Sequence, residues 1–391
     1  MQNILLTWQL SNRHGWGIAG LNIFCQWALM PDVRPMMLFP IEGTDIAIPD
    51  PQQREQIRQA VEFSNECAVR LTKMLLAKQQ ITVDIPVVHG LGNSFTTADE
   101  GLVKGAWNLG RIVFESSKTP AELPRNDRFD HFLCASEWNA SVLRAHTQKP
   151  VQVVHEGVNP LLFRPGSRSG ALAPGRFYIF TGGKIEYRKA QDLVLLAFRE
   201  FSRRHDDAVL VAAWHSPWPN MAKGFQGRLD APLELNADGK IDVTKWAADN
   251  GIDPSKVIDA GSIPNQAMPV ILREMDCALQ PSRAEGGTNF VAMEAMACGV
   301  PVIIARNTGA IDLIAENNCI ALERQSPVAD IEQLGCEGWG ESSVDEIVEA
   351  LERFYASSTL RKEIGAAGAA FMRERTWQKH AEQLKELIFS L

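Results

Sequence analysis

The sequence predicts an α/β protein with two Rossmann-like, doubly wound parallel-sheet domains that face a cleft. Short apolar runs of strand length alternate with amphipathic helical patterns along almost the whole chain, which is typical of βαβ units. A length of 391 residues fits two domains of roughly 150–200 residues better than one. The stretch 157–175, rich in Pro, Gly and Ser, interrupts the alternation and indicates a linker.

The elements of the first predicted domain, residues 1–165, follow from the spacing of apolar residues. A strand is expected at 3–8, and a glycine-punctuated loop separates it from a helix at 18–30. A long helix at 52–77 repeats apolar residues at the 3.6-residue period. Further strands are expected at 35–39, 85–88, 111–115, 131–135 and 151–155.

The second predicted domain, residues 166–375, repeats the architecture without repeating the sequence. Its strands are expected at 177–181, 208–213, 257–260, 277–280, 302–305 and 319–322. Its helices are expected at 190–203, 242–250, 266–273, 289–298, 344–355 and 359–373. The polar stretch 216–240 indicates an insertion or a lid, and residues 376–391 are assigned to a separate closing helix.

Composition excludes several classes of protein. A net charge of -8 and no long run of Lys or Arg argue against a nucleic-acid binder. The chain contains no apolar stretch near the roughly 20 residues of a membrane helix, and its start does not resemble a signal peptide. Seven scattered cysteines without CxxC spacing fit a reducing compartment. We therefore expect a cytoplasmic protein without a transmembrane segment, although peripheral membrane contact stays open.

The segment 281–303, PSRAEGGTNFVAMEAMACGVPVI, carries the strongest functional signal. It joins a predicted strand to a predicted helix through Gly286 and Gly287, which can turn backbone N–H groups toward an anion. Thr288 or Asn289 is expected to cap the helix, whose N-terminus favours negative charge. This pattern predicts a phosphate site.

Two carboxylates, Glu285 and Glu294, flank this predicted phosphate site. A carboxylate repels a phosphate, so its presence there indicates a ligand that also offers hydroxyl groups, as sugars and riboses do. The alternative is that both residues only stabilise the helix start, where Glu is favoured.

A second segment, 181–201, places Gly182 and Gly183 after a strand and Arg188 and Lys189 before a helix. The planar Arg fork and the Lys point charge suit a diphosphate. Two cations at a helix N-terminus are repelled by the positive end of the helix dipole. A bound polyanion would compensate for this repulsion. A solvated basic turn is the alternative.

The loop after the first strand contains Gly15, Gly17 and Gly20 in GxGxxG spacing, a weak signal by itself. No acidic residue follows at the place of a ribose-binding carboxylate, which disfavours NAD. We expect the loop to approach a phosphate or a sugar, with a packing turn as the alternative.

Two histidines are weaker candidates. His89 is expected to follow a strand, and His155 with Glu156 is expected to face the cleft. A hydrogen-bonded structural histidine is the alternative for both.

Taken together, these segments resemble the large family-four (group 1) retaining glycosyltransferases of GT-B fold. The resemblance covers nearly the whole chain and rests on SEWN…VVHEGVNP, on RK..D..L.AF and on EGGTN…MEAMACGVPVI. It implies transfer of a sugar from a nucleotide-diphosphate sugar, most often a UDP-sugar, to a hydroxyl-bearing glycan, protein or small molecule, with no cofactor and no metal. It also implies that the closing helix packs back on the first domain.

The resemblance assigns roles to residues of this chain. Glu285 would bind hydroxyls of the donor sugar, Glu294 would bind the nucleotide ribose, and Arg188 and Lys189 would hold the diphosphate. Further donor contacts are implied for Gly183 beside the basic pair, Gly286, Gly287, Thr288, Asn289, Phe290, Gly17 and, near the sugar, His89.

The sequence departs from the family pattern at two places. Eight residues separate Glu285 from Glu294, one more than usual, and Ala190 replaces the glycine that usually follows the basic pair. Two other functions stay open: a nucleotide-sugar epimerase, and a protein that binds a sugar nucleotide without catalysis.

Overall fold

The computed structural model describes residues 1–12, 14–42, 48, 50–92, 95–118, 128–216, 224–236, 239–331, 333 and 335–390. The chain forms two compact units, one of Met1–Asn159 with Arg375–Leu391 and one of Pro160–Glu374. The predicted boundaries were 165/166 and 375/376. Two parts of the expected insertion, 217–223 and 237–238, and Arg13 lie outside the described residues.

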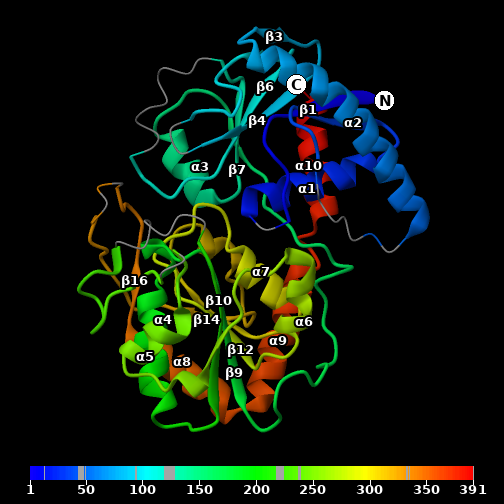
Figure 1. Ribbon diagram of the computed structural model, residues 1–391. Helices are drawn as coiled ribbons and strands as arrows, with labels where there is room; N and C mark the ends of the chain where they lie inside the picture. The colour runs from blue at the N-terminus through cyan, green and yellow to red at the C-terminus, as the bar shows by residue number, and fades with distance from the viewer. Residues whose placement is uncertain are drawn as a thin grey trace. The chain divides into compact units, whose positions relative to one another are not determined.

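Unit 1 is built on a six-stranded parallel sheet with the order β2-β1-β4-β6-β7-β8 (Figure 1). Its strands are β1 Gln2–Leu6, β2 Val33–Met37, β4 Val87–Leu91, β6 Asn108–Ile112, β7 His131–Cys134 and β8 Val151–Val153, with β3 Ile81–Thr82 and β5 Val103–Lys104 pairing separately. Its helices are α1 Gly15–Ala28, α2 Pro51–Leu76, α3 Glu137–Arg144 and α10 Trp377–Ser390.

Strand β1 shows why this sheet is buried on both faces. Ile4 and Leu6 pack in the core formed with α1 and α10, whereas Leu5 packs in a separate core with Ile81 and Val87. Side chains alternate between the two faces of a strand, so an unbroken apolar run is what a covered parallel strand requires.

Helix α10 is fixed to unit 1 by a buried hydrogen bond. The Trp27 Nε1 of α1 donates to the Ala381 carbonyl at 2.9 Å, and Leu384 and Ile388 enter the same core. The His380 imidazole is bonded to the His155 carbonyl at 2.9 Å, and burial lowers the His380 pKa to about 3. The end of the chain is therefore part of unit 1.

Unit 2 contains a second six-stranded parallel sheet, with the order β11-β10-β9-β12-β13-β14. Its strands are β9 Phe177–Gly183, β10 Ala208–Trp214, β11 Val257–Asp259, β12 Cys277–Gln280, β13 Val302–Ala305 and β14 Ile320–Leu322, with β15 Gln325–Ser326 and β16 Glu341–Ser342 pairing antiparallel. Its helices are α4 Gln191–Ser202, α5 Val243–Asp249, α6 Met268–Leu272, α7 Phe290–Ala297, α8 Val344–Ala356 and α9 Ser358–Met372.

Helices cover both faces of the second sheet. Figure 1 shows α4, α5 and α8 on one side of it and α6, α7 and α9 on the other. The α/β class with two Rossmann-like parallel sheets is therefore confirmed. The direction of winding reverses between β9 and β12, and ligands of such sheets bind where the loops after the two strands diverge.

The segment 160–175, expected to be part of a linker, is fastened to unit 2. Arg273 donates to the Leu162 carbonyl at 2.9 Å and to the Arg164 carbonyl at 3.1 Å. The Tyr178 hydroxyl donates to the Ala173 carbonyl at 3.0 Å. These polar contacts, which composition does not reveal, make this segment part of the second unit.

Candidate functional site

The loops after β9 and β12 bring together most of the predicted site residues. The first loop carries Arg188 and Lys189 on a 3-10 turn, Tyr187–Lys189, and the second carries Glu285. Because β9 and β12 are parallel neighbours, the two loops begin at the same edge of the sheet. The site therefore lies at the switch point of unit 2.

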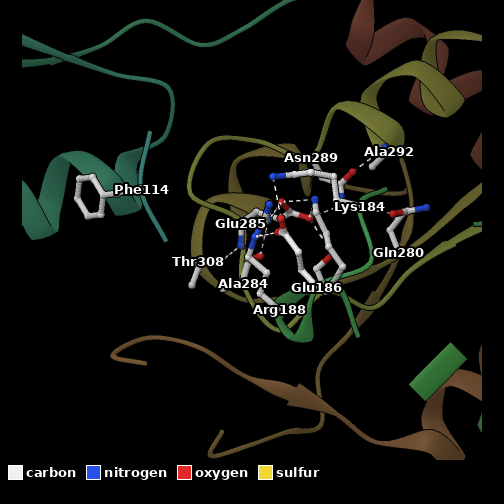
Figure 2. Close-up of polar contacts among 12 residues, drawn as sticks. Phe114, Lys184, Glu186, Arg188, Gln280, Ala284, Glu285, Asn289, Ala292 and Thr308 are labelled. Carbon is white, nitrogen blue, oxygen red and sulfur yellow. Dashed lines mark hydrogen bonds and ion pairs between the residues drawn. The ribbon is translucent and has the colours of Figure 1, made fainter. Parts of the chain in front are cut away.

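Glu285 lies at the centre of this site, as Figure 2 shows. Lys189 Nζ lies 2.7 Å from both carboxylate oxygens, and Arg188 Nη1 lies 3.2 Å from Oε2. Ser282 Oγ and Asn289 Nδ2 donate to Oε1 at 2.7 and 2.8 Å. The carboxylate is thus satisfied by two cations and two neutral donors, with 4% of its side chain exposed.

The two cations are largely shielded from solvent, which strengthens their field at the site. The side chains of Arg188 and Lys189 are 13% and 12% exposed. Burial lowers the Lys189 pKa, and the Glu285 carboxylate opposes this shift. Charges in such a shielded place act more strongly on an anion than charges in water.

A second carboxylate, Glu186, balances the same cluster. Its oxygens lie 2.7 Å from Arg188 Nε and 2.7 Å from Lys184 Nζ. Burial alone would raise the Glu186 pKa, but Arg188 and Lys184 lower it to about 2. Glu186 is therefore a carboxylate near neutral pH, and it orients Arg188.

The turn into α4 explains the departure at Ala190. Ala190 has φ 58° and ψ 37°, the left-handed conformation that glycine adopts most easily. The alanine is completely buried and starts α4 directly after the basic pair. A glycine could adopt this conformation without the strain that the Ala190 side chain adds.

Helix α7 begins, as predicted, directly after the glycine-containing loop 285–289. Asn289 is its N-cap, and the Asn289 Oδ1 accepts from the Ala292 N–H at 3.1 Å. The other Asn289 group, Nδ2, contacts Glu285, so one residue both starts the helix and holds the carboxylate. Thr288 is buried, and its hydroxyl lies 2.9 Å from Met293 Sδ.

Glu294 lies in α7 and is buried. The Asn265 amide donates to its Oε1. Burial raises the Glu294 pKa to about 8, and the Asn265 hydrogen bond only partly opposes the shift. Asn265, on the turn Asn265–Ala267, is a site residue that sequence analysis missed, because nothing local links it to Glu294.

Glu294 makes stability depend on pH with a definite sign. The pKa of Glu294 is about 8 in the folded protein and 4.5 ordinarily, so the folded state holds the proton more tightly than the unfolded state. The contribution of protonated Glu294 to the unfolding free energy is therefore complete below pH 4.5 and is lost as pH rises through 8. Relative to a Glu294→Gln variant, the wild type should lose up to about 4 kcal/mol of unfolding free energy between pH 5 and 8. Urea unfolding of both proteins across this range measures the difference, and parallel pH profiles would contradict the assignment.

A network of buried ion pairs centred on Arg283 contacts the two loops of the site. Arg283 is completely buried and donates to Asp192 Oδ1 and Oδ2 at 2.9 and 2.6 Å and to Glu341 Oε2 at 2.7 Å. It also donates to the Tyr187 carbonyl at 2.7 Å, and its backbone N–H donates to the Arg188 carbonyl at 2.6 Å. Arg283 therefore ties the loop of the two cations to the loop of Glu285.

Two predicted residues of unit 1 lie in other elements than the sequence suggested. Gly17 is in the first turn of α1 instead of in a loop, because α1 already starts at Gly15. His89 does not follow a strand; it lies inside β4, is completely buried and shares a 3.1 Å hydrogen bond with Asn108. Glu156, expected to face a cleft, is buried and paired with Arg111.

Gly17 is required by close packing. A Cβ atom at this position would lie 2.5 Å from both the backbone N and the Oγ of Ser11. Gly17→Ala should therefore lower the unfolding free energy by about 1–3 kcal/mol, the usual cost of overpacking. Urea denaturation measures this loss. An unchanged denaturation midpoint would contradict the prediction, because it would show that the backbone at Ser11 moves aside without loss of stability.

Among the residues that the structure describes, no group of three or more His, Cys, Asp or Glu side chains could hold a metal ion. Within the same part of the chain, no helix is both long and apolar enough to cross a membrane.

A known protein family matches most of unit 2. The family model for group 1 glycosyl transferases matches residues 166–371, more than half of the chain. The chain belongs to the group 1 glycosyltransferases. The family resemblance inferred from the motifs is therefore confirmed.

Curated relatives of this group 1 glycosyltransferase match only in part. A D-inositol 3-phosphate glycosyltransferase of Catenulispora acidiphila is 30% identical over 160 residues, 40% of this chain and 35% of the relative. A GDP-mannose-dependent mannosyltransferase of Mycolicibacterium smegmatis is 25% identical over 208 residues, 51% of this chain and 44% of the relative. The match thus spans about a third to less than half of the length of these proteins.

Solved structures of similar fold cover the whole group 1 chain. Sucrose-phosphate synthase from Thermosynechococcus elongatus aligns with a TM-score of 0.66 at 16% identity, over 99% of this chain and 98% of its own. The Anabaena protein HepE, solved with UDP-glucose, aligns with a TM-score of 0.60 at 12% identity over the full length of both chains. At these identities the likeness establishes the two-domain fold.

Proposed function

We propose that this group 1 glycosyltransferase moves a sugar from a nucleotide-diphosphate sugar to a hydroxyl-bearing acceptor, with retention of the anomeric configuration and without a metal. One observation carries the proposal: Arg188 and Lys189 converge on Glu285 at the switch point of unit 2. A diphosphate is the ligand class that two shielded cations suit, and hydroxyl groups are what a neighbouring carboxylate suits.

Each residue has a chemical task in this proposal. Lys189 and Arg188 bind the diphosphate together with the backbone of Gly183, Gly286 and Gly287 and the N-terminus of α7 at Thr288, Asn289 and Phe290. Glu285 accepts hydrogen bonds from hydroxyls of the donor sugar. Glu294, buried beside Asn265, accepts them from the ribose. A UDP-sugar is the first donor to test, because the fold neighbour HepE was solved with UDP-glucose.

Catalysis would follow from charge that develops on the leaving diphosphate. The bond between the anomeric carbon and the diphosphate oxygen breaks, and a bond from the acceptor oxygen to that carbon forms on the same face. The acceptor proton passes to the diphosphate oxygen. Arg188 and Lys189 contact the diphosphate more strongly as its charge grows, which lowers the barrier.

The test is incubation with a nucleotide sugar and a panel of glycan, inositol and sugar-phosphate acceptors, followed by NMR of the product. The proposal predicts acceptor-dependent release of nucleoside diphosphate and a product with the donor's anomeric configuration. Inverted product would refute retention. Donor conversion without any acceptor would indicate an epimerase, and binding without turnover would indicate a catalytically idle protein.

A further inference from the structure

Thr308 has a backbone conformation that β-branched residues rarely adopt. Its φ is 38°, in the left-handed region, and the residue is buried. Such a conformation is strained and persists only where the surrounding structure fixes it. Thr308 follows β13 and starts the 3-10 turn Thr308–Leu313 in unit 2.

The preceding residue fixes this conformation through its side chain. Asn307 Nδ2 donates to the Ser282 carbonyl at 2.9 Å, to Gln325 Oε1 at 3.0 Å and to the Gly340 carbonyl at 3.1 Å. The Thr308 hydroxyl donates to Asn307 Oδ1 at 3.1 Å. The Asn307 side chain therefore ties this turn to the loop after β12, to β15 and to the residue before β16.

The strained turn is hydrogen-bonded to the backbone of Glu285. The Glu285 N–H donates to Thr308 Oγ1 at 2.8 Å, and the Gly309 N–H donates to the Glu285 carbonyl at 2.9 Å. The approach is so close that a Cβ atom at Gly309 would lie 1.9 Å from the Gly287 carbonyl oxygen. Both polar backbone groups of Glu285 are thus held by two consecutive residues; Figure 2 shows the Thr308 contact.

Thr308 is hydrogen-bonded directly to Glu285, and its described side-chain hydrogen bonds do not reach Arg188 or Lys189. Lys189 and Arg188 follow β9, and their backbone is held by Arg283 and by the turn at Ala190. The described contacts of Thr308 go to Asn307 and Glu285. Loss of its hydroxyl should therefore act first on the backbone of Glu285, while the Arg283 hydrogen bonds to the Tyr187 and Arg188 carbonyls still hold the loop of the two cations.

We propose that Thr308 is a positioning residue that fixes the Glu285 carboxylate for recognition of the sugar part of the donor. This inference rests on the proposed function of the site. It predicts a division of labour: the hydroxyl of Thr308 contributes to affinity for a nucleotide sugar but not to affinity for the nucleoside diphosphate, whose charge is met by Lys189 and Arg188.

The experiment measures affinities of UDP and UDP-glucose by calorimetry for the wild type, Thr308→Val, Thr308→Ala and Thr308→Ser, with GDP and GDP-mannose run in parallel. Thr308→Val and Thr308→Ala should weaken the nucleotide sugar by about 10-fold or more and the diphosphate by less than about 2-fold. Thr308→Ser, which keeps the hydroxyl, should bind both within about 3-fold of the wild type.

Three results would overturn the proposal in distinguishable ways. Equal weakening of sugar nucleotide and diphosphate in both hydroxyl-free variants would show a general structural role, and no weakening would show that the hydroxyl is dispensable. If the wild type binds no nucleotide or nucleotide sugar, the proposed function fails and this inference fails with it. Thr308→Ala, which is smaller than valine, provides the result if Thr308→Val does not fold.

Discussion

Lys189→Ala is expected to lower the rate of sugar transfer by about 100- to 1000-fold, the range seen when one preorganised electrostatic group is lost. The reason is geometric: Lys189 Nζ lies 2.7 Å from both oxygens of Glu285, and the Lys189 side chain is only 12% exposed, so its charge is poorly screened by water. Release of nucleoside diphosphate at saturating donor and acceptor measures the effect.

Lys184→Ala is the matched control for this prediction. Lys184 lies in the same loop and pairs with Glu186 at 2.7 Å, but it is more exposed than Lys189 and its described ion pair does not involve Glu285. Its loss should change the rate by less than about 5-fold, as expected for a partly solvated pair. Similar losses in both variants would mean that general positive charge, and not the Lys189 contact, supports the reaction.

Arg283→Met is expected to lower the unfolding free energy by about 3–5 kcal/mol, because the buried Asp192 carboxylate loses its fully buried cation and, among the described residues, keeps only its pair with the more exposed Arg228. Burial would raise the Asp192 pKa, but the hydrogen bonds from Arg283 and Arg228 lower it. Urea denaturation at neutral pH measures the loss.

An exposed ion pair in the same unit provides the comparison. Arg306 lies 3.3 Å from Glu323, and both side chains are about half exposed. Arg306→Met should cost less than about 1 kcal/mol. If Arg283→Met costs no more than this control, the buried network does not hold the two loops together.

The parts of the site that could be predicted are those whose position is determined by neighbouring residues in the sequence. Arg188 with Lys189, and Glu285 with the cap Asn289, can be inferred from sequence because a strand, a glycine-rich turn and a helix start determine the place of each. The parallel sheets follow from the alternation of apolar runs and helical patterns in the same way.

The rest depends on partners that are distant in sequence. Arg283 meets Asp192 across 91 positions, Thr308 meets Glu285 across 23 and Asn265 meets Glu294 across 29. No local pattern reports such contacts. The GxGxxG spacing of Gly15, Gly17 and Gly20 suggests a loop, yet α1 already starts at Gly15 and Gly17 lies in its first turn.

The most direct test of the account is a thermal-shift screen with UDP-, GDP-, ADP- and dTDP-sugars, without metal, on the wild type, Lys189→Ala and Glu294→Ala. A ligand at 100 times its dissociation constant should stabilise the fold by about 2.7 kcal/mol. If Lys189 and Glu294 bind the donor, one nucleotide sugar raises the melting temperature of the wild type and of Lys184→Ala but of neither site variant. A wild type that responds to none of them, or site variants that respond as it does, would contradict a donor site built on Lys189, Glu285 and Glu294.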